Sequence, residues 1–109
     1  MDLAITGIGA VSPLGLSADE LCDGLLEGRV GIRSAPWAEL SGGGLYAAVD
    51  DRFDPDDYMD ARVVAGTDGN ARFALAAVAQ AIVDAGLDPA ALDDRRTGVV
   101  HGRLPGPWV

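Results

Sequence analysis

The residues with the most obvious chemical potential are one cysteine, one histidine, a Gly-Ile-Gly turn and an acidic run. Cys22 is the only thiol, and a cysteine becomes a good nucleophile where a neighbouring cation, histidine or helix amino terminus stabilises its thiolate. It lies beside Leu21 and Leu25 in a predicted helix, with no cation at helical spacing and no histidine nearby in the sequence. We therefore predict that Cys22 is a small buried hydrophobic residue.

His101 is the only histidine and lies at the end of a predicted strand, where α/β proteins often place functional groups. A metal site would need companion ligands, and a catalytic dyad would need a nucleophile. We predict instead a partly exposed side chain at the rim of the sheet. Ser12 and Ser17 have no paired general base, so nucleophilic serine chemistry has no support. The sequence thus predicts no catalytic, cofactor-binding or metal-binding residue.

The Gly7-Ile8-Gly9 turn follows a predicted strand, as the glycines of a dinucleotide-binding loop do. The third glycine of that fingerprint would fall at Ser12, and Pro13 would interrupt the turn into the helix. No second strand ends in an acidic residue about twenty positions later, as ribose recognition requires. A dinucleotide-binding module therefore remains only the least favoured alternative.

The acidic run from Asp50 to Asp60 has the density of a cation site. It lacks the Asp-x-Asp-x-Asp-Gly register and the distal glutamate of a calcium loop. We predict a solvated acidic loop.

Length and composition restrict the class of protein. The chain has 109 residues, 49% of them hydrophobic, which suits one small packed domain. Seventeen acidic residues against eight basic ones give a net charge of −9, which disfavours nucleic acid and anionic membranes as partners. One cysteine permits no internal disulfide, and no apolar run approaches the eighteen or so residues of a membrane span. A cytoplasmic location is expected.

The first third of the chain predicts a strand followed by a helix. Residues 3–11 are almost continuously apolar, which is typical of a strand covered on both faces in a parallel sheet. The Ser12-Pro13-Leu14-Gly15 segment then ends the strand. Ser17 and Glu20 form a predicted capping box, in which the Ser17 hydroxyl accepts from the Glu20 amide and the Glu20 carboxylate accepts from the Ser17 amide. The helix that begins there is expected to end at Gly28.

The rest of the chain predicts loops, a long helix and a second core strand. Between residues 29 and 67 we expect loops, a possible edge strand at 45–49 and a helical turn from Asp54-Pro55 to Met59. A helix over 70–85 is capped by Thr67 or Asp68 and ended by Gly86, with Leu87 folding back toward Ile82. Its apolar residues project from several directions, which indicates packing between a sheet and other protein. A short turn over 88–92 and a strand over 97–101 follow. This order predicts right-handed crossovers and a parallel α/β sheet.

Three stretches together resemble the β-ketoacyl synthases, the condensing enzymes of fatty-acid and polyketide assembly. They are Ala4-Ile5-Thr6-Gly7-Ile8-Gly9-Ala10-Val11-Ser12-Pro13-Leu14-Gly15, Leu21-Cys22-Asp23-Gly24-Leu25-Leu26-Glu27-Gly28-Arg29-Val30-Gly31-Ile32 and Ala71-Arg72-Phe73-Ala74-Leu75-Ala76-Ala77. The resemblance extends to about Gly102 and implies the beginning of a thiolase-like α/β fold. Residues 1–102 would form a partial synthase amino-terminal domain, followed by an irregular tail at 103–109.

The family to which the chain is similar performs a decarboxylative Claisen condensation between an acyl-cysteine and a malonyl group on acyl carrier protein. Its nucleophilic cysteine follows the strand that residues 97–100 resemble, and its two catalytic histidines lie further on. None has a counterpart here, so the resemblance implies an amino-terminal fragment that is inactive alone and needs no cofactor. Acyl carrier protein or a synthase subunit would be its partner.

One segment points to a different branch of that family. Residues 65–70, Ala-Gly-Thr-Asp-Gly-Asn, look closer to the chain length factors, partners that resemble synthases but lack the nucleophile. A noncatalytic interaction module therefore stays open beside the fragment. In either case the predicted core strands would lack neighbours, which leaves open edges, one uncovered face and marginal stability.

Overall fold

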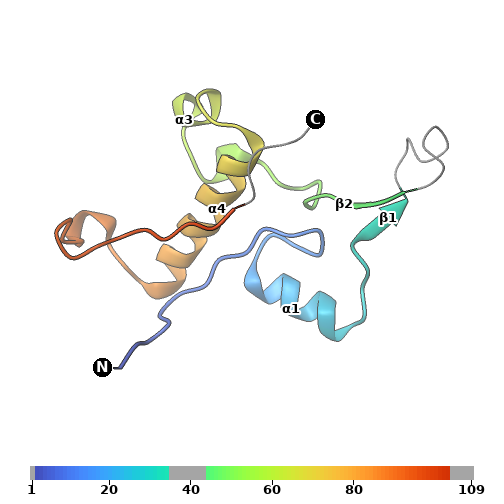
Figure 1. Cartoon of the computed structure of the whole chain (residues 1–109), viewed down its shortest axis with the longest axis horizontal. Helices are drawn as coiled ribbons and strands as arrows, with labels where there is room; N and C mark the ends of the chain where they lie inside the picture. The colour runs from blue at the N-terminus through green and yellow to red at the C-terminus, as the bar shows by residue number, and fades with distance from the viewer. Residues whose placement is uncertain (1, 35–43, 104–109) are drawn as a thin grey trace.

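The computed structural model describes residues 2–34 and 44–103, and its longest element is a seventeen-residue helix, α4 (Gly69–Ala85) (Figure 1). The amino-terminal segment and η1 lie against it. In chain order the elements are α1 (Ala18–Leu26), β1 (Ile32–Ser34), β2 (Leu45–Ala47), the 3-10 turn η1 (Pro55–Asp57), α3 (Ala61–Ala65), α4 and the 3-10 turn η2 (Pro89–Ala91). The predicted tail at 103–109 falls outside the described residues apart from Arg103.

Helix α4 begins and ends as its sequence predicts. The Asp68 carboxylate accepts a hydrogen bond from the Ala71 amide at 2.8 Å, so Asp68 is the cap of the two candidates. Gly86 ends the helix with a φ of 67°, a left-handed conformation that glycine adopts without the steric cost of a side chain. The Leu87 amide donates to the Ile82 carbonyl at 3.1 Å, which confirms that the chain folds back there.

Helix α1 is also capped by the predicted residue, with one difference. The Ser17 hydroxyl accepts from the Glu20 amide at 3.1 Å, as expected. The prediction that the Glu20 carboxylate accepts from the Ser17 amide is wrong, because Glu20 Oε2 accepts from the Leu16 amide at 2.7 Å. The capping box therefore holds the chain one residue before the cap.

Short Asp-Pro turns form where the sequence predicts them, and one helix was missed. Asp54 caps η1 and Asp88 caps η2, each accepting a hydrogen bond from the amide two residues on. The additional helix is α3, which has only five residues and is capped by Asp60; strand β1 was not predicted either. The one turn of α3 carries too little hydrophobic periodicity to be recognised in the sequence.

The sheet differs from the prediction. Among the described residues it has two strands, β1 and β2, which pair antiparallel with Arg33 opposite Tyr46. The predicted edge strand at 45–49 is confirmed as β2. The predicted parallel core strands at 3–11 and 97–101 do not form: both segments are described without a partner strand. A strand is defined by its ladder of hydrogen bonds, and none of the described residues forms a neighbouring strand beside these two segments.

The amino-terminal segment is held by α4 in place of a sheet. A Cβ added to Gly7 would overlap the carbonyl oxygen of Ala81, and one added to Gly9 would overlap that of Ala77. The two glycines therefore allow an approach of backbone to backbone that no larger residue permits. Alongside them, the Ile8 amide donates to Asp84 Oδ2 at 2.9 Å, and α4 also binds the Ala10 amide.

The apolar core of the described residues is small. Ala76 is the one hydrophobic residue they bury completely. An aromatic cluster adjoins it on α4, in which the Phe53 ring stacks on Tyr58 at 5.9 Å and meets the edge of Phe73 at 5.0 Å. The accessible surface is 8661 Å², against about 5,700 Å² for a self-contained monomer of this mass. Much apolar surface is therefore uncovered.

An exposed ion cluster ties the start of α1 to the segment after β2. Arg52 Nη2 lies 2.8 Å from both Glu20 Oε2 and Asp50 Oδ2, and Arg52 Nε donates to Asp50 Oδ1 at 3.0 Å. These hydrogen bonds from Arg52 lower the pKa of Asp50 from 3.8 to about 2. The interaction therefore stabilises the folded chain fully above about pH 4 and is lost as the pH falls toward 2.

A Gly9→Ala substitution tests the contact between the amino-terminal segment and α4. The added methyl group would collide with the Ala77 carbonyl, which belongs to the helix backbone and cannot move aside. We expect the free energy of unfolding, measured by urea denaturation, to fall by about 1–3 kcal/mol. The matched control is Gly69→Ala, because a Cβ at Gly69 meets nothing within 4 Å; it should be neutral or stabilising. Equal stability of the two variants would contradict the contact.

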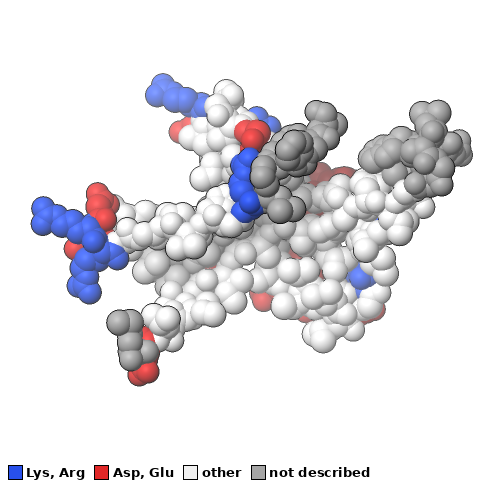
Figure 2. Space-filling view, in the orientation of Figure 1, with Lys and Arg blue, Asp and Glu red and all other residues white. Residues whose placement is uncertain are grey.

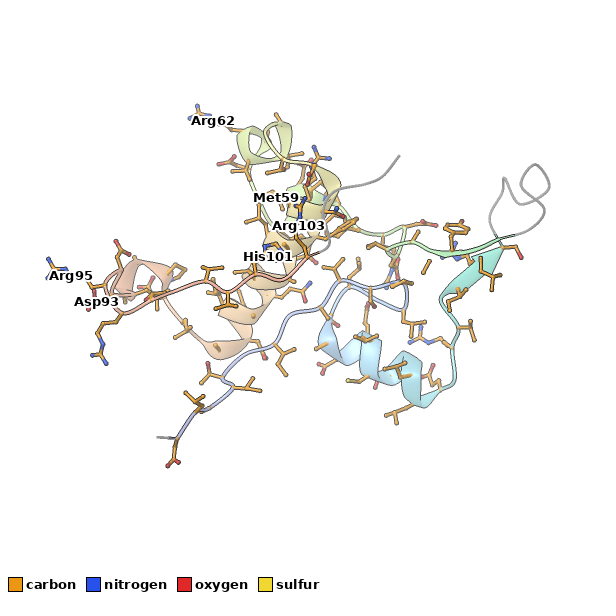
Figure 3. The ribbon with its side chains drawn as sticks, viewed as in Figure 1. Met59, Arg62, Asp93, Arg95, His101 and Arg103 are labelled. Atoms are coloured by element: carbon orange, nitrogen blue, oxygen red, sulfur yellow. The ribbon has the colours of Figure 1, made fainter. Side chains whose placement is uncertain are left out.

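An Arg52→Gln substitution tests the ion cluster. Without the guanidinium, the pKa of Asp50 should rise from about 2 toward its ordinary value of 3.8, measured by a carbon-13 NMR titration of the carboxyl group. Arg62→Gln serves as control, because Arg62 projects away from the molecule on α3 (Figure 3). The cluster is disproved if Asp50 titrates identically in all three proteins.

Candidate functional site

A groove of about 760 Å³ opens where the amino-terminal segment, the start of α1, η1 and α4 meet. It is a concave surface where four segments distant in sequence meet, and hence a place to look for chemistry. It is lined by Ile8, Leu16, Ser17, Ala18, Asp19, Asp57, Tyr58, Ala79, Gln80, Val83 and Asp84.

Gln80 is the polar residue on which this groove depends. Its side-chain oxygen accepts from the Ala10 amide at 3.1 Å, and its side-chain nitrogen donates to the Leu16 carbonyl at 2.6 Å and to the Tyr58 hydroxyl at 3.3 Å. One amide group thereby joins α4 to three other segments. These bonds use both hydrogens of the amide and one of the two lone pairs of its oxygen, so Gln80 mainly holds the walls of the groove together.

The groove is lined by three carboxylates and two hydroxyls, those of Asp19, Asp57, Asp84, Ser17 and Tyr58. Cysteine, histidine and arginine are missing from its described lining. Asp84 accepts from the Ile8 amide, and the Ser17 hydroxyl caps α1. Among the described residues, no hydrogen bond joins either hydroxyl to a carboxylate of the groove.

The charge at the edge of the groove is fixed by the capping of α1. Glu20 accepts from the Leu16 amide and pairs with Arg52, and these two interactions lower the pKa of its carboxyl. Glu20 is therefore a charged structural group at neutral pH. It fixes Leu16 and Ser17, which line the groove.

Ser12 and Ser17 are both structural. The Ser12 hydroxyl donates to the Gly15 carbonyl at 3.0 Å and accepts from the Leu14 and Gly15 amides, each at 3.2 Å. Its backbone carbonyl also accepts from the Asp50 amide at 3.1 Å. Ser17 caps α1. Among the described residues, the hydrogen bonds of these two hydroxyls are all to backbone groups.

Cys22 and His101 lie on separate elements, and the structure brings neither of them to the groove. Cys22 is exposed on α1, so the prediction that it is buried is wrong. The inner side of the helix is formed by Gly24, which packs on Leu14, and Cys22 points elsewhere. His101 is exposed in the segment after η2, but without the predicted strand. Within the described part of the chain, neither side chain makes a hydrogen bond or an ion pair.

The Gly7-Ile8-Gly9 turn has a packing role in this structure. Both glycines face the backbone of α4, so the space that a pyrophosphate would need is filled by helix carbonyls. A helix carbonyl also carries the wrong partial charge for a phosphate, which binds to amides at helix amino termini. This geometry argues against a dinucleotide-binding loop.

The acidic run is largely used to organise the backbone. Asp50 pairs with Arg52, Asp54 caps η1, and Asp60 accepts from the Val63 amide at 2.9 Å to cap α3. Across residues 2–34 and 44–103, no three histidine, cysteine or acidic side chains gather as a metal site would require. The predicted acidic loop is largely exposed, but three of its carboxylates also form hydrogen bonds that cap helices or bind Arg52.

Two residues important to this region were missed in the sequence. Gln80 is a polar residue within a helix of alanine and aliphatic residues, and that contrast was the available signal. Arg52 is the one cation within the acidic run from Asp50 to Asp60. Both act through contacts with segments distant in sequence, which local patterns do not specify.

None of the helices that the structure describes has both the length and the apolar composition of a membrane span.

Comparison with known proteins gives one consistent family. A family described as the N-terminal domain of beta-ketoacyl synthase matches residues 1–106. The 3-oxoacyl-[acyl-carrier-protein] synthase 2 of Coxiella burnetii is 33% identical over 98% of this chain and 27% of its own length. An actinorhodin polyketide putative beta-ketoacyl synthase 2 of Streptomyces coelicolor is 35% identical over 97% of this chain and 26% of its own length. The 3-oxoacyl-[acyl-carrier-protein] synthase 1 of Escherichia coli is 33% identical over 90% and 24%.

The chain thus spans about a quarter of the length of these relatives. The matched region contains the glycines that pack on α4 and the helix that carries Gln80. Since the match covers nearly all of its residues, the chain belongs to the β-ketoacyl synthase family, as a counterpart of that family's amino-terminal domain.

Proposed function

We propose that this chain supplies the amino-terminal scaffold of a β-ketoacyl synthase of fatty-acid or polyketide biosynthesis and contributes no reacting group to the condensation. The observation that carries the proposal is the isolation of its two reactive side chains. Cys22 lies on α1 and His101 in an extended segment, both exposed and without a hydrogen-bonding partner among the described residues. The nucleophile and its histidines must come from other parts of a synthase.

The role of the scaffold is to start the α/β core. Residues 3–11 and 97–101 are extended and apolar, and we propose that they become parallel core strands of the thiolase-like fold when the rest of a synthase is present. Their exposed side chains and missing ladders support this assignment. In this proposal residues 1–102 form the beginning of the synthase amino-terminal domain, and residues 103–109 are a tail outside it.

Partners follow from the same proposal. Two relatives of this chain are named 3-oxoacyl-[acyl-carrier-protein] synthases, so the proposal gives the assembled synthase acyl carrier protein as a partner. The net charge of −9 disfavours nucleic acid as a partner.

Purified chain incubated with an acyl thioester and malonyl-acyl carrier protein should form no β-ketoacyl product. Intact-protein mass spectrometry should also find no acyl adduct on Cys22, because no neighbouring base activates the thiol. A complete synthase of the family is the positive control, and Cys22→Ser controls for nonspecific labelling. Turnover by the chain, together with an adduct lost in Cys22→Ser, would overturn the proposal.

A noncatalytic partner of the chain length factor type is the second candidate, and the segment Ala65 to Asn70 favours it. That segment ends α3 at Gly66 and caps α4 at Asp68, and the Thr67 hydroxyl donates to the Val63 carbonyl at 2.8 Å. The segment therefore has a structural role in joining α3 to α4. Its similarity to chain length factors is a separate observation, and that similarity is what favours the second candidate.

Co-expression with a complete β-ketoacyl synthase separates the two candidates. A complete synthase already has its own amino-terminal quarter and offers no place for another copy, so the scaffold proposal predicts that the chain elutes separately in size-exclusion chromatography. A stoichiometric complex would instead establish the partner role.

A further inference from the structure

The groove between the amino-terminal segment, α1, η1 and α4 has an apolar floor that is open to solvent. Ile8 and Val83 line it with 57% and 80% of their surfaces exposed, and Leu16 lines it half-buried. Large aliphatic side chains on a concave surface gain free energy when another apolar group covers them. Because the groove is open rather than enclosed, it can receive a segment of another chain.

Every charged side chain in the described lining of this groove is a carboxylate. Asp19 comes from α1, Asp57 from η1 and Asp84 from α4, so three segments distant in sequence bring negative charge to one hollow. No ion pair within residues 2–34 and 44–103 involves any of the three. Like charges gathered without a cation raise the electrostatic free energy of the groove, and a cation placed among them lowers it.

Two of these carboxylates are not needed to begin the elements that carry them. Ser17 caps α1 and Asp54 caps η1, whereas the side chains of Asp19 and Asp57 make no hydrogen bond to another described residue. The helix dipole favours a carboxylate in the first turn of α1 on any side of the helix. The placement of both aspartates on the one groove is therefore not explained by local structure.

The chain places none of its own cations in this groove. All eight of its basic residues are arginines in the described segments, and none of them lines the groove. On the face drawn in Figure 2, most arginine side chains stand on projections at the rim. The net charge of −9 also attracts a basic partner from a distance and repels a second copy of the chain. The cation that complements the groove must therefore come from a different molecule.

We propose that this groove binds a basic segment of a partner protein. Lysine and arginine match both properties of the lining, because each carries a charged group at the end of an aliphatic stem. Their stems lie on the apolar floor, and their cations lie beside Asp19, Asp57 and Asp84. The scaffold function makes no use of this surface, so the two proposals are independent of each other.

Binding of an acetylated and amidated hexalysine peptide to the full chain, measured by calorimetry at low ionic strength, tests the carboxylates. Asp19→Asn combined with Asp57→Asn should weaken binding about fivefold or more, because two exposed ion pairs are lost. Asp2→Asn combined with Asp94→Asn is the matched control. It removes the same charge at the exposed amino-terminal end and beside Arg95, at a tip that projects away from the molecule (Figure 3).

This control should weaken binding less than about twofold, since distant surface charges are screened. An equal loss of affinity in the two double variants would show attraction to net charge alone and would overturn the proposal. Both variants change exposed side chains, so their melting temperatures should stay within about 2 °C of that of the parent chain.

Two measurements test the apolar floor. The methyl NMR signals of Ile8, Leu16 and Val83 should shift during the peptide titration, whereas those of Val99 and Val100, which are also exposed, should not. A hexamer of diaminobutyric acid carries its charges on shorter stems and should bind at least about threefold more weakly than hexalysine. Methyl shifts confined to Val99 and Val100, or equal affinity of the two peptides, would contradict the proposed contact.

Other occupants of the groove give different results. Spermidine that displaced hexalysine at equal concentration would make the groove a site for free amines and would overturn the protein partner. A folded chimera in which residues 1–106 replace the matching quarter of the Coxiella burnetii synthase should still bind the peptide. Loss of binding there would show that the rest of a synthase covers the groove, which would also overturn the proposal. None of these outcomes depends on condensation activity.

Discussion

The close contact between the amino-terminal segment and α4 is the constraint on which the other features depend. Gly7 and Gly9 let two backbones approach, and Asp84 and Gln80 supply acceptors for the amides that this approach leaves without a strand partner. Gln80 then extends the contact to Leu16 and Tyr58. Asp84 and Gln80 of α4 therefore position the groove, the segment before α1 and the residue that follows η1.

The segments of this chain are joined mainly by hydrogen bonds, and its apolar core is small. Side-chain hydrogen bonds contribute modestly to stability, about 1 kcal/mol each, because they replace bonds to water. Burial of apolar area is the larger driving force, yet Ala76 is the one hydrophobic residue fully buried in the described chain. The polar contacts hold the segments in order, and many large apolar side chains of the described residues stay exposed.

The sequence predicts the features of this fold that are encoded within a few residues. The caps Ser17, Asp54, Asp68 and Asp88 are correct, because a capping side chain and the amide it accepts are two or three positions apart. The missing strands, the exposure of Cys22 and the contacts of Gln80 and Arg52 depend on segments tens of residues away. Parallel strands are predicted from two apolar runs, and the described residues supply no neighbouring strand for either run.

The sequence predicts no reactive site residue, and the structure adds the use that the chain makes of its glycine pair. A glycine pair after a strand serves equally well for a phosphate or for a helix, and the residue types alone do not choose between them. The choice is made by the alanines of α4, spaced so that Ala77, Ala81 and Ala85 present a flat surface to Gly7 and Gly9. Once those glycines are used for packing, the opening stretch serves to hold the chain against α4, and its backbone is not free to approach a phosphate.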